Sequence, residues 1–300
     1  MSWHALSFDV EHWYDATLVG RGGSRPGQAG DAEREVDAVL AMLAERDARA
    51  TFFVLGALAA ELPQVVRGVA AAGHEVACHG WGHELAGALG PGRFGAAARR
   101  ARALLQDLSG QEVRGYRAAT WSIGPATAWA SEELCRAGFA YDSSVFPLRT
   151  PLYGMASAPR VPYRIATAGG EIVELPPAVG AFGPLPVPLA GGIYWRVLPL
   201  WVVRAGLARM AAPAVLYAHP WEVAPAGWRL PPHTPLGVRL SMHFGSAHLA
   251  RVLAALVASV EVRPLAVLEA HCRARPGARY RWVGGRLVAE ATAAGPDAPL

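Results

Sequence analysis

Two short segments place carboxylate and imidazole side chains at spacings that suit metal chemistry. One residue separates Asp9 from Glu11, and three residues separate His79 from His83. Side chains alternate along an extended strand, so the two acids are expected on one side of it. Two imidazoles and one carboxylate are a ligand set that suits Zn²⁺ or a similar divalent cation. Each segment also has a simpler interpretation. The two acids could be loop residues that cap the next element, and the two histidines could be loop residues that bind no ligand.

Two more chemically useful residues follow expected strands. Arg117 comes after the segment 113–116, and an arginine beside a carboxylate keeps that group ionised and oriented. His219 comes after 214–218, and a histidine that titrates near neutrality can act as a general acid. The alternatives are a surface arginine and a buried structural histidine.

The elements that position these residues follow an alternating pattern. Short apolar segments typical of strands are separated by stretches of helical periodicity. The expected strands in the first half are 5–8, 51–55, 75–78 and 113–116. Such alternation favours parallel strands joined by right-handed crossovers, hence an α/β sheet or barrel. The polar segments follow strands, and the carboxyl ends of the strands form the active face in this architecture.

The second half of the chain is less regular. Residues 147–188 are rich in proline and glycine and are interpreted as an insertion with one strand, at 171–175. A helix at 194–210, a strand at 214–218 and a helix at 246–260 follow. We expect one domain over 1–272, and a hairpin or disordered tail over 273–300 whose last ten residues are frayed.

Composition excludes several classes of protein. The 300 residues are 52% hydrophobic and 17% charged, which is typical of a folded chain with a large core. All 28 basic residues are arginines and they are scattered, which argues against nucleic-acid binding. Cys78, Cys135 and Cys272 form no pattern of disulfides or zinc ligands. No secretory signal or membrane span is expected, which favours a cytoplasmic protein; the sequence does not give the oligomeric state.

Taken together, the motifs resemble the polysaccharide deacetylases of carbohydrate esterase family four. Matching segments occur in the family's order at 7–11, 79–83, 115–117, 141–144 and 216–219, and the resemblance extends over about residues 3–268. The segments 9–14, 191–196, 219–222 and 243–256 are similar to a narrower subfamily found near exosortase-type exopolysaccharide loci. Two positions depart from the common pattern, because Val10 stands where a second aspartate is usual and Ala119 where a proline is usual.

The resemblance implies a fold and a set of roles. The fold would be a distorted (β/α) barrel of about seven strands, with the insertion and a C-terminal extension. Glu11, His79 and His83 would bind the metal, most simply zinc, with cobalt or nickel as alternatives. Asp9 would be the catalytic base and His219 the acid. Arg117 would keep Asp9 charged, and Asp142 would orient His219 or balance its charge.

The implied function is hydrolysis of the acetamide group of an N-acetylated amino sugar. The substrate would be a polysaccharide, an oligosaccharide or a lipid-linked precursor, in exopolysaccharide biosynthesis. Candidates for a sugar-stacking platform are aromatic residues near the motifs, namely Trp13, Tyr14, Trp81, Trp121 and Trp221. Two alternatives stay open: an amidohydrolase of small cyclic imides or ureides, and a non-catalytic barrel that binds a glycan or a partner.

Overall fold

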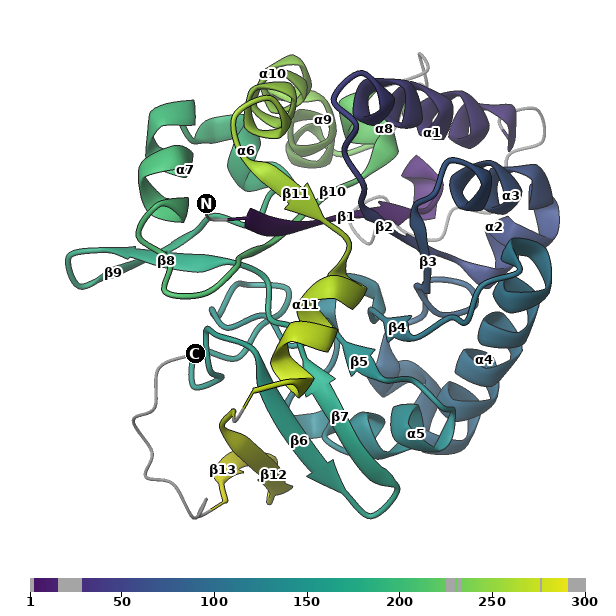
Figure 1. Cartoon of the computed structure of the whole chain (residues 1–300), viewed down its shortest axis with the longest axis vertical. Helices are drawn as coiled ribbons and strands as arrows, with labels where there is room; N and C mark the ends of the chain where they lie inside the picture. The colour runs from purple at the N-terminus through teal and green to yellow at the C-terminus, as the bar shows by residue number, and fades with distance from the viewer. Residues whose placement is uncertain (1–2, 16–28, 225–229, 231–233, 276, 291–300) are drawn as a thin grey trace.

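The centre of the fold is one large, mostly parallel β-sheet (Figure 1). The computed structural model describes residues 3–15, 29–224, 230, 234–275 and 277–290. Within them, eleven strands form one sheet in the order β10-β1-β2-β3-β4-β5-β7-β6-β12-β13, with β11 also paired to β1. These strands are β1 (Trp3–Val10), β2 (Thr51–Val54), β3 (Glu75–Cys78), β4 (Gly115–Tyr116), β5 (Tyr141–Asp142), β6 (Tyr163–Thr167), β7 (Gly170–Glu174), β10 (Val215–Ala218), β11 (Glu261–Arg263), β12 (Arg279–Val283) and β13 (Arg286–Ala289).

Seven strands of this sheet, from β10 through β1 to β5 and β7, are parallel neighbours. A parallel bridge joins Pro177, just beyond β7, to Val215 of β10, so the two ends of the run approach each other. The separate strands β8 (Val179–Phe182) and β9 (Leu185–Pro188) form a hairpin. The predicted α/β fold with a parallel sheet is therefore confirmed.

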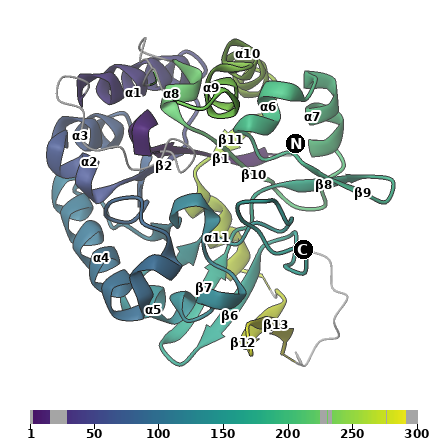
Figure 2. The same ribbon diagram turned by 180° about the vertical axis from the view of Figure 1, so that it is seen from behind.

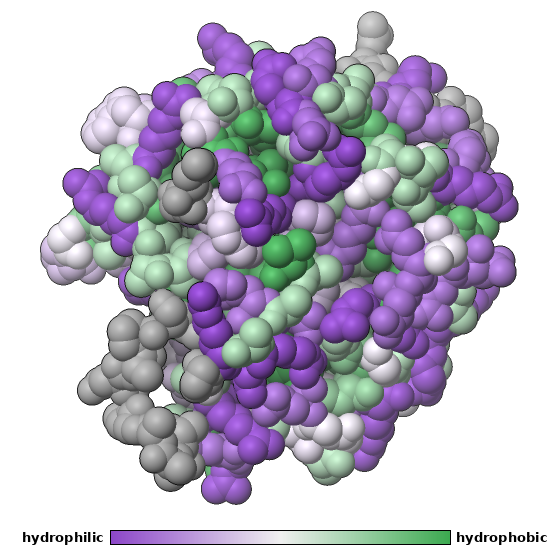
Figure 3. All heavy atoms as spheres, in the orientation of Figure 1, coloured by the Kyte–Doolittle hydropathy of each residue, from purple (hydrophilic) through white to green (hydrophobic). Residues whose placement is uncertain are grey.

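Helices cover the outside of the sheet, as the opposite views in Figures 1 and 2 show. They are α1 (Ala29–Ala44), α2 (Gly56–Glu61), α3 (Pro63–Ala71), α4 (Ala86–Ser109), α5 (Ala130–Arg136), α6 (Ile193–Val197), α7 (Leu200–Leu207), α8 (Pro220–Val223), α9 (Leu236–His243), α10 (Ser246–Val257) and α11 (Leu265–Arg273). On the face seen in Figure 3, hydrophilic side chains predominate over outer helices such as α3 and α4. No helix in the described ranges is long and apolar enough to cross a membrane.

The two sides of the sheet bury different apolar layers. Leu6, Phe8 and Val10 of β1 belong to the large cluster that includes the surrounding helices. Ala5 instead belongs to a smaller cluster with Phe53 and side chains from β3, β5, β7 and β10. Because alternate residues of a strand face opposite sides, Ser7 and Asp9 lie on the side of this inner cluster. Leu265 and Leu268 of α11 join the inner cluster near the start of β1.

Two expectations for the second half need correction. The helix expected over 194–210 is divided into α6 and α7, because Pro199 lacks the amide hydrogen needed to continue the first helix. The insertion at 147–188 contains β6, β7, β8 and β9 rather than one strand.

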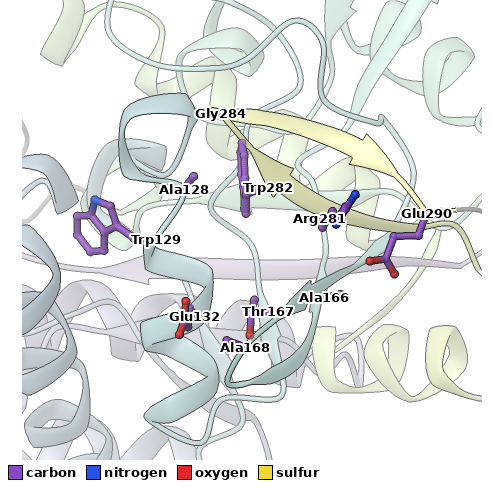
Figure 4. A pocket seen from close by; sticks show the side chains of 11 residues that line it. Ala128, Trp129, Glu132, Ala166, Thr167, Ala168, Arg281, Trp282, Gly284 and Glu290 are labelled. Atoms are coloured by element: carbon purple, nitrogen blue, oxygen red, sulfur yellow. The ribbon is translucent and has the colours of Figure 1, made fainter.

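The C-terminal residues 279–289 form a hairpin, β12–β13, that extends the sheet through β6. Residues 291–300, expected to be frayed, lie outside the described residues. A pocket of about 530 Å³ lies between this hairpin, α5 and the turn that joins β6 to β7 (Figure 4). Trp282 is fixed there by an indole N–H that donates to Ser131 Oγ at 3.1 Å. None of the predicted catalytic or metal-binding residues lines this pocket.

Candidate active site

The predicted metal ligands come together at the carboxyl ends of β1 and β3. Glu11, His79 and His83 each offer a ligand atom, and these atoms all lie within 4.8 Å of one another. Glu11 Oε2 lies 2.8 Å from His83 Nε2 and 3.8 Å from His79 Nε2. This oxygen is buried without a well-aligned hydrogen bond. A buried carboxylate oxygen between two imidazole nitrogens fits the donor set of a divalent cation.

The orientation of His79 also suits metal binding. Its Nδ1 lies 2.8 Å from the carbonyl oxygen of Arg117, which fixes this nitrogen as the donor and leaves Nε2 free to face Glu11. Burial lowers the pKa of His79 to about 4, so the ring is neutral, as a ligand must be. His83 has a left-handed backbone (φ 58°), a conformation that residues other than glycine seldom adopt. Such strained positions cluster at functional sites.

Charge concentrates around Glu11. Burial alone would raise the pKa of this carboxyl, but His83, His219 and His79 together outweigh burial and lower it to about 2. Glu11 is therefore ionised at neutral pH.

The predicted pair of Asp9 and Arg117 is present and buried. Arg117 Nη1 donates to Asp9 Oδ1 at 2.6 Å and to Ser7 Oγ at 2.9 Å. The other side of the guanidinium donates to Ser143 Oγ at 3.0 Å, and the group lies 4.2 Å from the ring centre of Phe53. Both charged side chains are almost completely buried, so each depends on the other for compensation.

His219 lies across the site from this pair. Its Nε2 is 3.7 Å from Glu11 Oε1, and its Nδ1 is 2.6 Å from Glu222 Oε2. Burial alone would lower the pKa of His219, but Glu222, Glu11 and Asp9 together raise it to about 9. The imidazole is therefore protonated at neutral pH in this structure, and Glu222 fixes its orientation.

Glu222 is itself held by Arg196 of α6, with which it forms a buried salt bridge. Arg196 also donates to the carbonyl oxygen of Met242 at 3.0 Å. Neither Glu222 nor Arg196 received a role in the sequence analysis. The signal was the i, i+3 spacing of His219 and Glu222, which places Glu222 on the first turn of α8 and His219 at the cap of that turn.

The structure does not bring Asp142 to His219, which corrects the role expected for it. Asp142 lies on β5, accepts a hydrogen bond from Ser144 Oγ, and is paired with Glu174. Ser144 Oγ in turn accepts a hydrogen bond from the backbone amide of Ala118, next to Arg117. Asp142 therefore supports the segment that carries Arg117.

A pocket of about 180 Å³ contains these groups. Asp9, Glu11, His79, His83 and His219 line it together with a largely apolar wall. That wall includes Leu152, Tyr153, Ile193, Tyr217 and Met242. The polar atoms are thus concentrated at the strand ends, as in most small-molecule sites.

The five aromatic residues proposed as a sugar platform separate into two groups. Trp121 and Trp221 line the pocket, and the Trp221 ring stacks on His219. Trp13, Tyr14 and Trp81 do not line it. Trp13 is buried against Trp221, Tyr14 stacks on His12, and Trp81 lies beneath the guanidinium of Arg100.

Family models match two consecutive parts of the chain. Residues 28–136 match the model described as polysaccharide deacetylase. This match covers just over a third of the chain, and it is that part which is similar to polysaccharide deacetylases. Residues 143–267 match a domain of unknown function, DUF3473, so the narrower exosortase-associated subfamily stays a prediction. No curated protein matches the sequence.

Solved structures share the fold of this chain. A Mycobacterium smegmatis protein assigned as a polysaccharide deacetylase has a TM-score of 0.60 at 24% identity, with 91% of each chain covered. A Pseudomonas aeruginosa PAO1 protein with the same assignment has a TM-score of 0.58 at 18% identity and 90% coverage of both chains. Puue allantoinase has a TM-score of 0.58 at 18% identity, with 90% of this chain and 89% of that chain covered. At these identities the likeness shows the fold alone.

Proposed function

We propose that this protein is a metal-dependent N-deacetylase that hydrolyses the acetamide of an N-acetylated amino sugar. The observation that supports it is the single pocket in which the Glu11, His79 and His83 cluster lies beside Asp9 and His219. The carbohydrate class comes from the match to the polysaccharide deacetylase model and from Trp121 and Trp221, whose rings suit stacking on a sugar. The sugar belongs to a polysaccharide, an oligosaccharide or a lipid-linked precursor.

The proposed hydrolysis requires two proton transfers, and a different residue carries out each. A divalent cation held by Glu11, His79 and His83, most simply zinc, would polarise the acyl carbonyl and acidify the attacking water. Asp9 accepts the proton of that water as the carbon–oxygen bond forms, and the Arg117 guanidinium holds the Asp9 carboxylate in place through its hydrogen bond. His219 gives its proton to the leaving nitrogen as the carbon–nitrogen bond breaks. Acetate and the free amine are the products.

Glu222 prepares His219 for this second transfer. The Nδ1 hydrogen bond fixes the ring so that Nε2 faces the pocket, and the carboxylate stabilises the imidazolium. Arg196 compensates the buried charge of Glu222.

A second candidate is hydrolysis of a small cyclic amide. The fold likeness to an allantoinase and the modest pocket volume of about 180 Å³ favour it. The chemistry of attack would be the same, but ring opening would replace acetate release.

The test is product release from defined substrates by the metal-loaded protein. Acetate release from chitooligosaccharides or peptidoglycan fragments supports the deacetylase. Ring opening of a cyclic imide without acetate release supports the second candidate. Asp9→Asn serves as the matched inactive control. Retained glycan binding without turnover of any of these substrates would instead favour a binding protein.

A further inference from the structure

An exposed apolar surface borders the mouth of the active-site pocket. It is formed by Ile193 and Val197 of α6, Trp201 of α7, Leu236 and Leu240 of α9, and Phe244 just after α9; we call these six residues the apolar rim. Each side chain is between 44% and 70% exposed. Single exposed apolar residues are common, but groups of large ones mark interaction surfaces.

The helices that carry the apolar rim are neighbours in the fold. The Arg196 side chain donates a hydrogen bond to the carbonyl oxygen of Met242. The backbone of Gly245 also lies close to Arg196, because a Cβ added to this glycine would be 2.6 Å from the backbone oxygen of Arg196. These contacts hold α6 against the end of α9. Both views of the ribbon show α6, α7 and α9 close together (Figures 1 and 2). Ile193 also lines the active-site pocket, next to Met242.

The exposed charges on the segment that carries the apolar rim have one sign. Between Glu174 and Glu261 the sequence contains six arginines and a single acid, Glu222. Glu222 is buried and paired with Arg196, so it contributes no negative charge to the surface. Four of the arginines in the described part of this stretch, Arg204, Arg209, Arg239 and Arg251, are exposed on or beside α7, α9 and α10.

We infer that the apolar rim and its arginines bind the surface of an anionic membrane. Exposed aromatic and aliphatic side chains enter the boundary between headgroups and acyl chains, while arginines beside them contact lipid phosphates. Trp201 suits this boundary, since tryptophan is enriched at membrane interfaces. Arg204 follows Trp201 in α7 by three residues, and Arg239 follows Leu236 in α9 by three residues, so each arginine lies on the same helix face as an apolar residue of the rim. The absence of surface acid on these described helices favours lipid phosphate over a neutral apolar partner.

This attachment would place the pocket beside the lipid surface, because Ile193 belongs to both the apolar rim and the pocket wall. The inference does not depend on the deacetylase chemistry, since lipid binding can be measured without a substrate.

The experiment is co-sedimentation of the full chain with vesicles. We expect binding to vesicles of equal parts phosphatidylcholine and phosphatidylglycerol, weakened by salt, and weaker binding to phosphatidylcholine alone. Trp201→Glu combined with Leu240→Glu should weaken binding by at least about tenfold, because two apolar groups no longer enter the lipid. Arg239→Gln should reduce the preference for anionic vesicles.

The matched control is Val283→Glu, which makes the same chemical change at an exposed apolar position on β12, outside the apolar rim. It should bind vesicles as the unchanged protein does, and circular dichroism should show that all variants are folded. No binding to anionic vesicles overturns the inference, as does equal binding by the control and the double variant. A dimer in sedimentation that Trp201→Glu dissociates, with no vesicle binding, would assign the surface to a second copy.

Discussion

The imidazole of His219 is held by Glu222, whose Oε2 lies 2.6 Å from Nδ1, and not by Asp142. The supporting carboxylate therefore comes from the helix that directly follows His219. This relationship makes Glu222 a positioning residue for the proposed acid and gives the first prediction.

Glu222→Gln should lower kcat by at least about 100-fold with little change in KM, because the amide neither fixes the imidazolium nor balances its charge. Metal content, measured by mass spectrometry, should be unchanged, since Glu222 is not among the ligand atoms. Thermal melting separates this effect from the loss of the Arg196 pair, and Glu33→Gln, at a half-exposed position of α1 away from the pocket, is the control. Full activity in a folded Glu222→Gln protein would reject the positioning role.

Asp9→Asn should retain the metal and lose hydrolysis by about 100-fold or more, because asparagine cannot accept the proton of the water. Arg117 would then lack its buried partner, so the free energy of unfolding should also fall. Turnover and metal content measured on the same preparation test both statements. Unchanged turnover contradicts the assignment of Asp9 as the base.

His79→Ala should remove the bound cation, because only two of the three ligands remain. The measurement is metal content after dialysis, which requires no substrate. His271→Ala, on α11 away from the site, is the control for loss of a histidine. Full metal occupancy in His79→Ala would show that the cation binds elsewhere.

Asp142→Asn should change the pH dependence of stability. Burial raises the pKa of Asp142 to about 7, and burial and Asp142 raise that of Glu174. A carboxyl whose pKa is raised in the folded protein binds its proton more tightly there than in the unfolded chain. Protonation therefore stabilises the fold fully below about pH 4, and this stabilisation is lost as the pH rises toward 7.

The asparagine side chain is neutral at every pH, so the Asp142→Asn variant should not lose this stability as the pH rises. Between pH 4 and pH 8 the unfolding free energy of the unchanged protein should fall relative to Asp142→Asn by at least about 1 kcal/mol. Urea denaturation at a series of pH values measures the difference, and Asp107→Asn on the surface of α4 is the control. Parallel curves for the two proteins would show that Asp142 does not hold a proton.

Gly115→Ala should destabilise the sheet between β4 and β5. A Cβ at this position would lie 2.1 Å from the ring of the buried Tyr141. Such overpacking costs about 1–3 kcal/mol. Gly92→Ala, where an added Cβ meets nothing within 4 Å, should leave the denaturation midpoint unchanged or slightly raised. Equal midpoints for the two variants would contradict the close packing.

Local sequence patterns were sufficient to predict the strands that carry the proposed metal ligands. The period of two in β1 predicts that Asp9 and Glu11 share a side, and the strand before His79 predicts that this residue lies at the carboxyl ends of the parallel strands. Arg196 was not predictable in the same way. It reaches Glu222 from a separate helix, and no spacing in the sequence relates residues that meet only through tertiary packing.

The direction in which the aromatic side chains point was also not predictable from the sequence. Trp81 stands within the His79–His83 segment, yet its ring packs over Gly56 and beneath Arg100 rather than in the pocket. Its direction depends on the space that a glycine leaves on α2. Similarly, β6, β8 and β9 lie in a proline- and glycine-rich stretch whose pairing is decided by neighbours in space.

The partners of strand β1 determine when the active site can assemble. Ala5 pairs with Val215, and Trp3 pairs with Glu261, so β1 must wait for strands that are made more than 200 residues later. Contacts of such long sequence separation slow folding, since the intervening chain must be ordered before they form. A nascent chain that ends before β10 therefore lacks both His219 and the strand that pairs with residues 5–8 of β1, so the proposed site cannot assemble until β10 has been made.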